Sequence, residues 1–451
     1  MTLPSGTIGN LAPVQRAAFL AAVGEQMRTE ISDLRQDTVA AELVGDHVRT
    51  RASCRRPSRL RCSVRRRRLR MRVLFSSTWG VGHVFPMVPL ARAFVAAGHD
   101  VLWVTNEPTC ALVRAAGIEA RAGGLGSDGL AEVRRRLAEG TAPLPGPARA
   151  GFAFPHMFGA WATPAMATDL LETARAWRPD LLLHEPAELA SALVGAVLGV
   201  RSLTHSWGGS VPPELLVAAG EKVAPVWAAH GLDVAPYAGS FSSTYLDLCP
   251  PSVQPVPLDH VPDRQPLRPG RYSGERPGPG SEPAPLAGAP LVYLTFGTVH
   301  SSASVMGAAL SGLSGHPVRV LATVGRDGDP DAFGPLGENV RVERWASQAD
   351  VLPRASLVVS HAGSGTVLGA LGLGLPQLCL PQAADQFRNT DAVVARGAGL
   401  GITPDRLSPE GVHDAVGRLL DEPGFRSSAG EVAAEIAAMP AAEDVVTLLA
   451  T

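Results

Sequence analysis

One stretch near the C-terminus, residues 356–386, constrains the fold more than any other part of the chain. Ser356–Ser360 and Gln377–Leu380 each have the pattern of a short buried strand. Between them, Val367–Leu373 has the pattern of a helix, which Gly374 and Pro376 end. A strand, a turn, a helix and a second strand in so few residues predict a unit of a parallel α/β sheet.

The turn between this strand and this helix consists of small residues. Backbone N–H groups at a helix start lack partners within the helix, and the helix dipole adds positive potential there, so the turn suits a phosphate group. Asp385 and Gln386 follow the next strand and return to the same edge, where they can hold sugar hydroxyls. We therefore expect an enzyme that uses a nucleotide-sugar. Its candidate diphosphate-binding residues are His361, Gly363, Ser364, Gly365 and Thr366.

Length and composition narrow the class of protein. A chain of 451 residues is too long for one ordinary core, and 45% hydrophobic residues fit a well-buried α/β protein. The net charge of −2 gives no strong attraction to nucleic acid or to an anionic membrane. The five cysteines form no C-x-x-C pair and have no metal-site spacing. Apolar runs fall short of the roughly 20 residues of a membrane span, and nothing resembles a signal peptide, so we expect a cytoplasmic protein.

The order of strand and helix patterns predicts four regions. Residues 1–70 include an Arg-rich run and are predicted to be a disordered basic extension; binding to nucleic acid or anionic lipid is the alternative. Residues 71–250 and 291–451 each alternate strands and helices, which predicts two Rossmann-like domains facing across a cleft. Residues 251–290 are rich in Pro and Gly and are predicted to link them.

Particular elements are expected within these two domains. The first domain should have helices at Pro86–Ala97 and Thr163–Trp177, with residues 121–160 mainly in loops. The expected strands are Arg72–Phe75, Asp100–Val104, Leu181–His184, Leu291–Thr295, Val318–Val324, Val340–Val342, Leu357–Val359 and Gln377–Leu380.

Two titratable residues follow strands of the first domain. His83 is expected on the loop after the first strand, and Glu185 follows Leu181–His184. Both therefore lie at one edge of the sheet, where a neutral imidazole can take a proton from a hydroxyl and a carboxylate can fix its tautomer. A helix-capping histidine and a helix N-terminal carboxylate are the alternatives. We expect His83 to be the catalytic base and Glu185 its partner.

The remaining candidates follow strands of the second domain. Gly297 lets the backbone approach a diphosphate and Thr298 can donate to it, although an ordinary turn is the alternative. Trp345 can stack on a nucleobase or pack in the core, and Gln348 can bind base or ribose.

Neither a metal nor a cofactor is expected. No His/carboxylate cluster in the sequence marks a metal site, so we expect the leaving diphosphate to be stabilised by Thr298, His361 and the helix N-terminus. Gly80 and Gly82 lack the third glycine of a dinucleotide fingerprint, which disfavours an NAD enzyme.

These motifs together resemble the GT-B fold glycosyltransferases of family 1, in particular actinobacterial enzymes that attach deoxysugars to natural products. The likeness runs from Met71 to about Leu449. It rests on the motifs G-x-G-H-x-x-P-x-x-x-L-A, R-P-D, F-G-T, W-x-x-Q, H-x-G-x-G-T and P-Q-x-x-D-Q.

The resemblance implies how the work is divided between the domains. The acceptor binds the N-terminal domain, the nucleotide-sugar binds the C-terminal domain, and the C-terminal helix crosses back to the first. His83 acts as base with Glu185, which stands where Asp is commoner, and Gly82 joins the donor-binding residues. The acceptor pocket would involve Trp79, Phe85, residues 121–160 and Trp207.

The resemblance also narrows the reaction. Relatives that use UDP-sugars often carry a Glu where this chain has Gly369. Loss of that ribose ligand favours dTDP, whose deoxyribose has no 2′-hydroxyl. We expect an inverting, metal-independent transfer of a deoxysugar to a hydroxyl of a hydrophobic small molecule. A catalytically weak helper homologue and a nucleotide-sugar epimerase are the alternatives, and a homodimer or a separate helper protein stays open.

Overall fold

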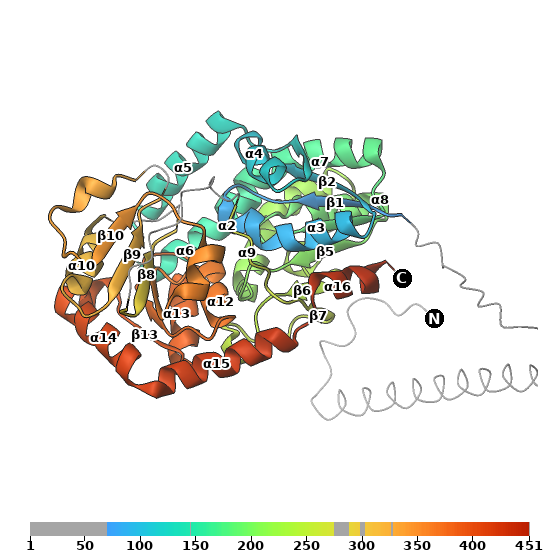
Figure 1. Cartoon of the computed structure of the whole chain (residues 1–451). Helices are drawn as coiled ribbons and strands as arrows, with labels where there is room; N and C mark the ends of the chain where they lie inside the picture. The colour runs from blue at the N-terminus through green and yellow to red at the C-terminus, as the bar shows by residue number, and fades with distance from the viewer. Residues whose placement is uncertain (1–69, 145, 275–287, 298–302, 326–327, 451) are drawn as a thin grey trace, which may run out of the picture. The chain divides into compact units, whose positions relative to one another are not determined.

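The computed structural model describes residues 70–144, 146–274, 288–297, 303–325 and 328–450 (Figure 1). The predicted basic extension up to residue 69, part of the predicted linker and the candidate Thr298 lie outside these residues. Two parallel sheets organise the described chain, one made of strands β1 to β7 and the other of β8 to β13. The predicted α/β class with two Rossmann-like sheets is confirmed.

The first sheet has the strand order β3-β2-β1-β4-β5-β6-β7. The order reverses between β1 and β4, so the carboxyl ends of these two strands form a topological switch point, where α/β proteins bind ligands. The strands are β1 (Arg72–Ser76), β2 (Asp100–Thr105), β3 (Glu119–Ala122), β4 (Leu181–His184), β5 (Ser202–His205), β6 (Tyr245–Asp247) and β7 (Arg264–Pro266).

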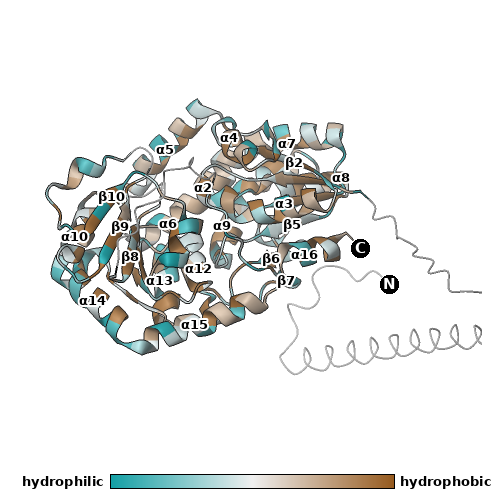
Figure 2. Ribbon diagram, viewed as in Figure 1, coloured by the Kyte–Doolittle hydropathy of each residue, from teal (hydrophilic) through white to brown (hydrophobic). Residues whose placement is uncertain are grey.

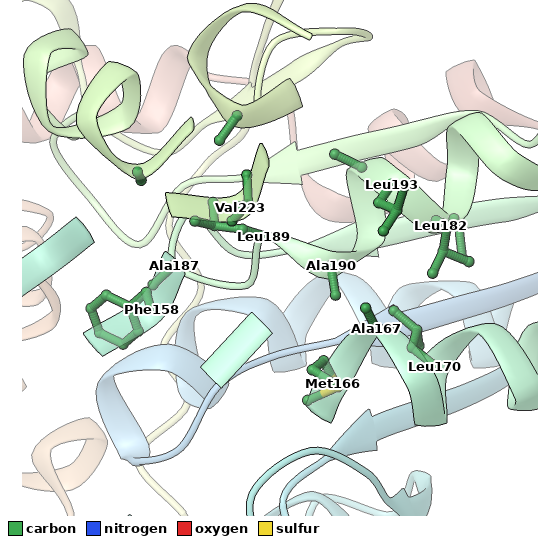
Figure 3. Packing of buried hydrophobic residues seen from close by; sticks show 14 of the residues in the cluster. Phe158, Met166, Ala167, Leu170, Leu182, Ala187, Leu189, Ala190, Leu193 and Val223 are labelled. Atoms are coloured by element: carbon green, nitrogen blue, oxygen red, sulfur yellow. The ribbon is translucent and has the colours of Figure 1, made fainter. Parts of the chain in front are cut away.

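Both faces of this sheet are buried, which explains the apolar runs of its strands. Successive side chains of β1 point to opposite faces, so Leu74 belongs to one core cluster and Phe75 to the other. On the Leu74 face, Met166 and Leu170 of α7 (Thr163–Trp177) pack near Ala190 of α8 (Ala190–Leu198) (Figure 3). On the other face, the Phe75 ring stacks on the Trp103 ring at 5.2 Å between centroids.

One of the two helix predictions for this domain was incomplete. The helix expected from Pro86 begins earlier, because Gly80 adopts a positive φ of 99° and α2 (Val81–Val84) starts directly after it. The 3₁₀ turn η1 (Phe85–Met87) then leads into α3 (Val88–Ala96). The helix predicted at Thr163–Trp177 is confirmed as α7.

Residues 121–160 are largely helical rather than loops. They contain α5 (Ser127–Thr141), α6 (Gly146–Phe154) and most of the π-helix η2 (Pro155–Ala162). Arg135 of α5 pairs with Glu132 at 2.7 Å and with Glu139 at 2.6 Å, three and four residues away on the same face. Such pairs stabilise an exposed helix and offset the unfavourable glycines. The remaining helices of this part are α4 (Glu107–Ala115), α9 (Pro213–Ala228), η3 (Pro236–Gly239) and η4 (Pro251–Val253).

The second sheet has the order β10-β9-β8-β11-β12-β13, with its own switch point between β8 and β11. All five predicted strands are confirmed to within one or two residues, and the sixth, glycine-rich β13 was not predicted. The strands are β8 (Leu291–Thr295), β9 (Arg319–Thr323), β10 (Val340–Glu343), β11 (Leu357–Ser360), β12 (Gln377–Cys379) and β13 (Gly399–Gly401).

Among the helices that follow β8, α14 (Pro409–Asp421) has a buried apolar face and hydrophilic outer residues (Figure 2). The helix predicted at Val367–Leu373 begins earlier, at Ser364. The helices are α10 (Ala303–Leu313), η5 (Pro330–Phe333), α11 (Gln348–Val351), η6 (Leu352–Arg354), α12 (Ser364–Leu371), α13 (Gln386–Ala395), η7 (Pro404–Arg406), α14 (Pro409–Asp421), α15 (Pro423–Ala438) and α16 (Ala442–Leu449).

The C-terminal helix returns to the first sheet, as predicted. Val445 and Val446 of α16 are buried in the same core cluster as Phe75, and α16 packs on α3 (Figure 1). The Arg268 N–H donates to the Pro440 carbonyl at 2.8 Å just before this helix. No helix among the described residues is long and apolar enough to cross a membrane.

Candidate active site

The switch point of the first sheet brings His83 and Glu185 together. Glu185 directly follows β4. His83 lies in α2, which begins after the short loop that follows β1, rather than on that loop as predicted. The His83 Nδ1 atom is 3.2 Å from Glu185 Oε1. The Glu185 side chain is fully buried, whereas that of His83 is 23% exposed, so the imidazole can reach a ligand while its partner cannot.

Thr78 completes this cluster and was not predicted. Its hydroxyl donates to Glu185 Oε1 at 2.7 Å and lies 3.0 Å from His83 Nδ1. Its backbone N–H also donates to Oε1 at 2.9 Å, and the Ala187 N–H donates to Oε2 at 2.6 Å. Both carboxylate oxygens are therefore held by fixed donors from the loops after β1 and β4.

This arrangement assigns the tautomer of His83. The hydroxyl hydrogen of Thr78 is directed to Glu185, so the hydroxyl oxygen and the carboxylate can only accept a hydrogen bond from Nδ1. Nδ1 therefore carries the proton, and the lone pair of Nε2 is available as a base.

Glu185 is held as an anion in spite of its burial. Burial alone would raise the pKa of Glu185 and is the largest single influence, but the charge and hydrogen bond of His83 and the hydrogen bonds of Thr78 outweigh it. The net result is a pKa below the ordinary value. A buried carboxylate that stays ionised can stabilise an imidazolium formed when His83 accepts a proton.

Aromatic rings surround the imidazole. The Trp207 ring lies edge-on at 4.7 Å between centroids and the Phe158 ring at 5.7 Å. Trp79 and Phe158 line a cavity beside Thr78. Phe85, which was expected there, packs instead against the Tyr272 ring at 5.0 Å.

The switch point of the second sheet brings together Gly297, after β8, and His361, after β11. Gly297 has a φ of 68°, and a Cβ atom built on it would lie 3.0 Å from His361 Cε1. Only glycine suits both the backbone conformation and this contact. The next residue after His361, Ala362, also has a positive φ, of 62°, and the turn ends at Gly363, the residue before α12.

Hydrogen bonds tie the turn before α12 to the loop after β12. The Ser364 hydroxyl donates to Asp385 Oδ2 at 2.8 Å. Asn389, another residue that was not predicted, donates from Nδ2 to Ala362 O, Ser364 Oγ and Asp385 Oδ2 at 2.9, 3.1 and 2.9 Å. The turn before α12 and the loop after β12, which the sequence predicts to bind the nucleotide-sugar, are thus joined by one network of hydrogen bonds.

The other candidates have distinct environments. Gln386 is 4% exposed, and its Oε1 accepts the N–H groups of Gln382 and Ala383, so it holds its own loop. Gln348 Nε2 donates to Thr366 Oγ1 at 3.2 Å, and Trp345 is half-buried.

Gly82 and Gly365 are exposed and have open space around them, so backbone can be approached at both positions. In the described part of the chain, no three His, Cys, Asp or Glu side chains are grouped as a metal site would require.

The comparisons with known proteins agree with this architecture. Two domains of the family described as "Erythromycin biosynthesis protein CIII-like" match, the N-terminal domain over residues 152–257 and the C-terminal domain over residues 319–451. A curated "L-demethylnoviosyl transferase" of Streptomyces niveus is 32% identical over 388 residues, which are 81% of this chain and 97% of that protein. The chain belongs to this family of glycosyltransferases.

Solved structures support the same assignment. The glycosyltransferase SnogD from Streptomyces nogalater is 29% identical, with a TM-score of 0.68 over 84% of this chain and 99% of that one. The glycosyltransferase SsfS6 from Streptomyces sp. SF2575, solved in complex with thymidine diphosphate, is 26% identical, with a TM-score of 0.67 over 84% and 99%. The predicted family, GT-B fold and enzyme class are confirmed.

Proposed function

We propose that this glycosyltransferase transfers a deoxysugar from a dTDP-sugar to a hydroxyl group of a hydrophobic small molecule, with inversion and without a metal. The observation that carries the proposal is the cluster of His83, Thr78 and Glu185 beside an apolar cavity. The thymidine diphosphate complex of SsfS6 supports the choice of donor nucleotide.

The cluster suits general-base catalysis. Nε2 of His83 accepts the proton of the acceptor hydroxyl, and the Glu185 carboxylate stabilises the resulting imidazolium. The acceptor oxygen forms its bond to the anomeric carbon as the bond from that carbon to the diphosphate oxygen breaks. A positioned base of this kind contributes roughly 10²–10⁴-fold to the rate.

The leaving diphosphate acquires negative charge, which this chain can stabilise without a metal. The N-terminus of α12 provides backbone N–H groups and a favourable dipole, and His361 lies next to it. Thr298 is proposed to donate a further hydrogen bond to the diphosphate. Asp385 and Gln386 would hold the sugar hydroxyls, while Trp345 and Gln348 would hold the nucleoside.

The environment of Gly369 supports dTDP over UDP. Gly369 itself has no carboxylate that could bind a ribose 2′-hydroxyl. A Cβ atom built on Gly369 would lie 3.2 Å from Leu352 Cδ1, so the space for a longer side chain is already restricted. A donor without the 2′-hydroxyl loses nothing at this position.

Ligand-linked thermal stabilisation of the full chain tests the proposal without knowledge of the acceptor. A ligand that binds only the folded state stabilises it by about 2.7 kcal/mol at 100 times its Kd. We expect dTDP and dTDP-glucose to raise the melting temperature more than UDP and UDP-glucose, and NAD to have no effect. No shift with any nucleotide would contradict the proposal, and dTDP binding without transfer or hydrolysis would favour a helper protein.

A further inference from the structure

Two turns with a strained backbone meet at the proposed nucleotide-sugar site. Ala362, in the turn before α12, has a φ of 62°, and Ala384, in the loop before α13, has a φ of 54°. A left-handed backbone is unfavourable for alanine, so contacts from the surrounding structure must hold each turn in place. Helices α12 and α13, which follow the two turns, lie side by side (Figure 1).

The side chain of Asn389 joins the two turns. Asn389 lies near the start of α13 and is 6% exposed, although asparagine is a poor helix former. Its Nδ2 atom donates to Ala362 O at 2.9 Å, to Ser364 Oγ at 3.1 Å and to Asp385 Oδ2 at 2.9 Å. The two hydrogens of Nδ2 are shared among these three acceptors. The amide therefore connects the strained turn before α12 to the carboxylate that follows Ala384.

These bonds fix one oxygen of the Asp385 carboxylate. Oδ2 accepts hydrogen bonds from Asn389 and from the Ser364 hydroxyl, the latter at 2.8 Å. Within the described part of the chain, Oδ1 accepts no hydrogen bond, and it is not fully buried. Asp385 does not cap α13 either, although it directly precedes that helix. One carboxylate oxygen is thus turned to the protein, and the other is available to a ligand.

The start of α12 explains why this carboxylate has to be held. Ser364 is the first residue of α12, so the Asp385 carboxylate lies beside the N–H groups that are proposed to bind the diphosphate. A carboxylate that could rotate would turn toward these N–H groups and compete with the diphosphate. Because Asn389 and Ser364 hold Oδ2, Oδ1 keeps one direction, as recognition of a sugar hydroxyl requires.

We infer that Asn389 is a positioning residue for the sugar of the nucleotide-sugar. Its amide fixes Asp385 so that Oδ1 accepts a hydrogen bond from a sugar hydroxyl. An NH₂ group suits this role, because the three partners of Nδ2 are all oxygens that accept hydrogen bonds. The inference rests on the proposed function, in which Asp385 holds a sugar hydroxyl, and it adds the residue that orients this contact.

The test separates binding of the sugar from binding of the nucleotide. Calorimetry with the full chain gives the ratio of the Kd of dTDP-glucose to the Kd of dTDP. We expect Asn389→Ala and Asn389→Asp to raise this ratio about tenfold, because the sugar hydroxyl loses a hydrogen bond to a charged group. Asp385→Ala should raise the ratio by a similar factor. Addition of Asn389→Ala to Asp385→Ala should raise it no further, since Asn389 acts through Asp385.

Asn339→Ala is the matched control. Nδ2 of Asn339 also donates to three oxygens, the carbonyls of Leu313, His316 and Val318, at 3.0, 3.2 and 3.0 Å. Asn339 directly precedes β10, so it lies at the edge of the parallel sheet opposite to the proposed site. This variant should lower the melting temperature but leave the ratio of the two Kd values unchanged.

The results that contradict the inference differ from those that contradict the proposed function. A ratio unchanged by both Asn389 variants but raised by Asp385→Ala would overturn the inference alone. So would additive effects in the double variant, or an equal rise in Asn339→Ala, which would indicate a general loss of stability. A ratio unchanged by Asp385→Ala would overturn the proposed role of Asp385 and the inference with it. Failure of the wild type to bind dTDP or dTDP-glucose would contradict both the proposed function and the inference.

Discussion

Replacement of Glu185 by Gln probes the catalytic cluster through a change of a single heavy atom. The carboxylate accepts the Thr78 N–H and hydroxyl at Oε1 and the Ala187 N–H at Oε2. An amide can place its NH₂ group at only one of these two positions. At Oε2 it meets the Ala187 N–H, and one buried donor is left unsatisfied, which costs about 1–3 kcal/mol of folding stability.

The other orientation leaves the buried Thr78 N–H unsatisfied in the same way, and it also disables the base. With NH₂ at the Oε1 position, the amide can only donate a hydrogen bond at this point. Nδ1 of His83, which lies beside it, must then accept that hydrogen bond. The imidazole proton then moves to Nε2, the atom that must accept the acceptor's proton. In either orientation the imidazolium loses its anionic partner. We expect turnover to fall about 10²–10⁴-fold.

The assay is release of dTDP from a dTDP-deoxysugar in the presence of a hydroxylated hydrophobic acceptor, with dTDP affinity measured in parallel. The dTDP affinity should not change, because Glu185 follows a strand of the first sheet whereas the proposed dTDP site lies at the second sheet. Glu188→Gln is the matched control, since Glu188 is equally buried and bonded to backbone N–H groups but makes no contact with His83. The turnover of Glu188→Gln should stay at least ten times higher than that of Glu185→Gln. Turnover of Glu185→Gln within threefold of the wild type would refute this account of the cluster.

Two further predictions concern other residues. Burial raises the pKa of Asp247 from 3.8 to about 6, so the folded state retains a proton that the unfolded state has lost, and stability falls as the pH rises from about 4 to about 6. At about 1.4 kcal/mol per pH unit, the loss in the free energy of unfolding is about 3 kcal/mol. Urea unfolding across this pH range should show the loss in the wild type but not in Asp247→Asn. Parallel curves of unfolding free energy against pH for the two proteins would contradict the assignment. Gly297→Ala should weaken dTDP binding about tenfold or more. Alanine at a φ of 68° costs about 1–2 kcal/mol, and its Cβ atom would crowd the His361 ring. An unchanged dTDP affinity in calorimetry would show that this turn does not contact the dTDP-sugar.

Much of the fold could be predicted because buried parallel strands are continuous apolar runs. The strands at Leu181–His184 and Leu291–Thr295 have the bounds that the pattern predicts. The juxtaposition of His83 and Glu185 followed from the same logic, since residues that follow adjacent parallel strands meet at one edge of a sheet. Motif spacing therefore carried three-dimensional information.

What could not be predicted depends on contacts between distant residues. Thr78 looks like an ordinary loop residue until β4 brings Glu185 within 2.7 Å of its hydroxyl. Asn106 has the sequence pattern of a helix cap, and only the structure reveals that its side chain does not act as one. The helix at Ser127–Thr141 was hidden by its glycines, because the ion pairs that offset them are formed only on the folded helix.

The measurement that tests the central claim most directly is single-turnover sugar transfer by His83→Ala, with dTDP affinity determined on the same protein. The account predicts that transfer slows by roughly 10²–10⁴-fold while dTDP binds as tightly as in the wild type, because the base and the donor site lie on different sheets. Transfer at the wild-type rate, with equal donor affinity, would contradict the assignment of His83 as the base.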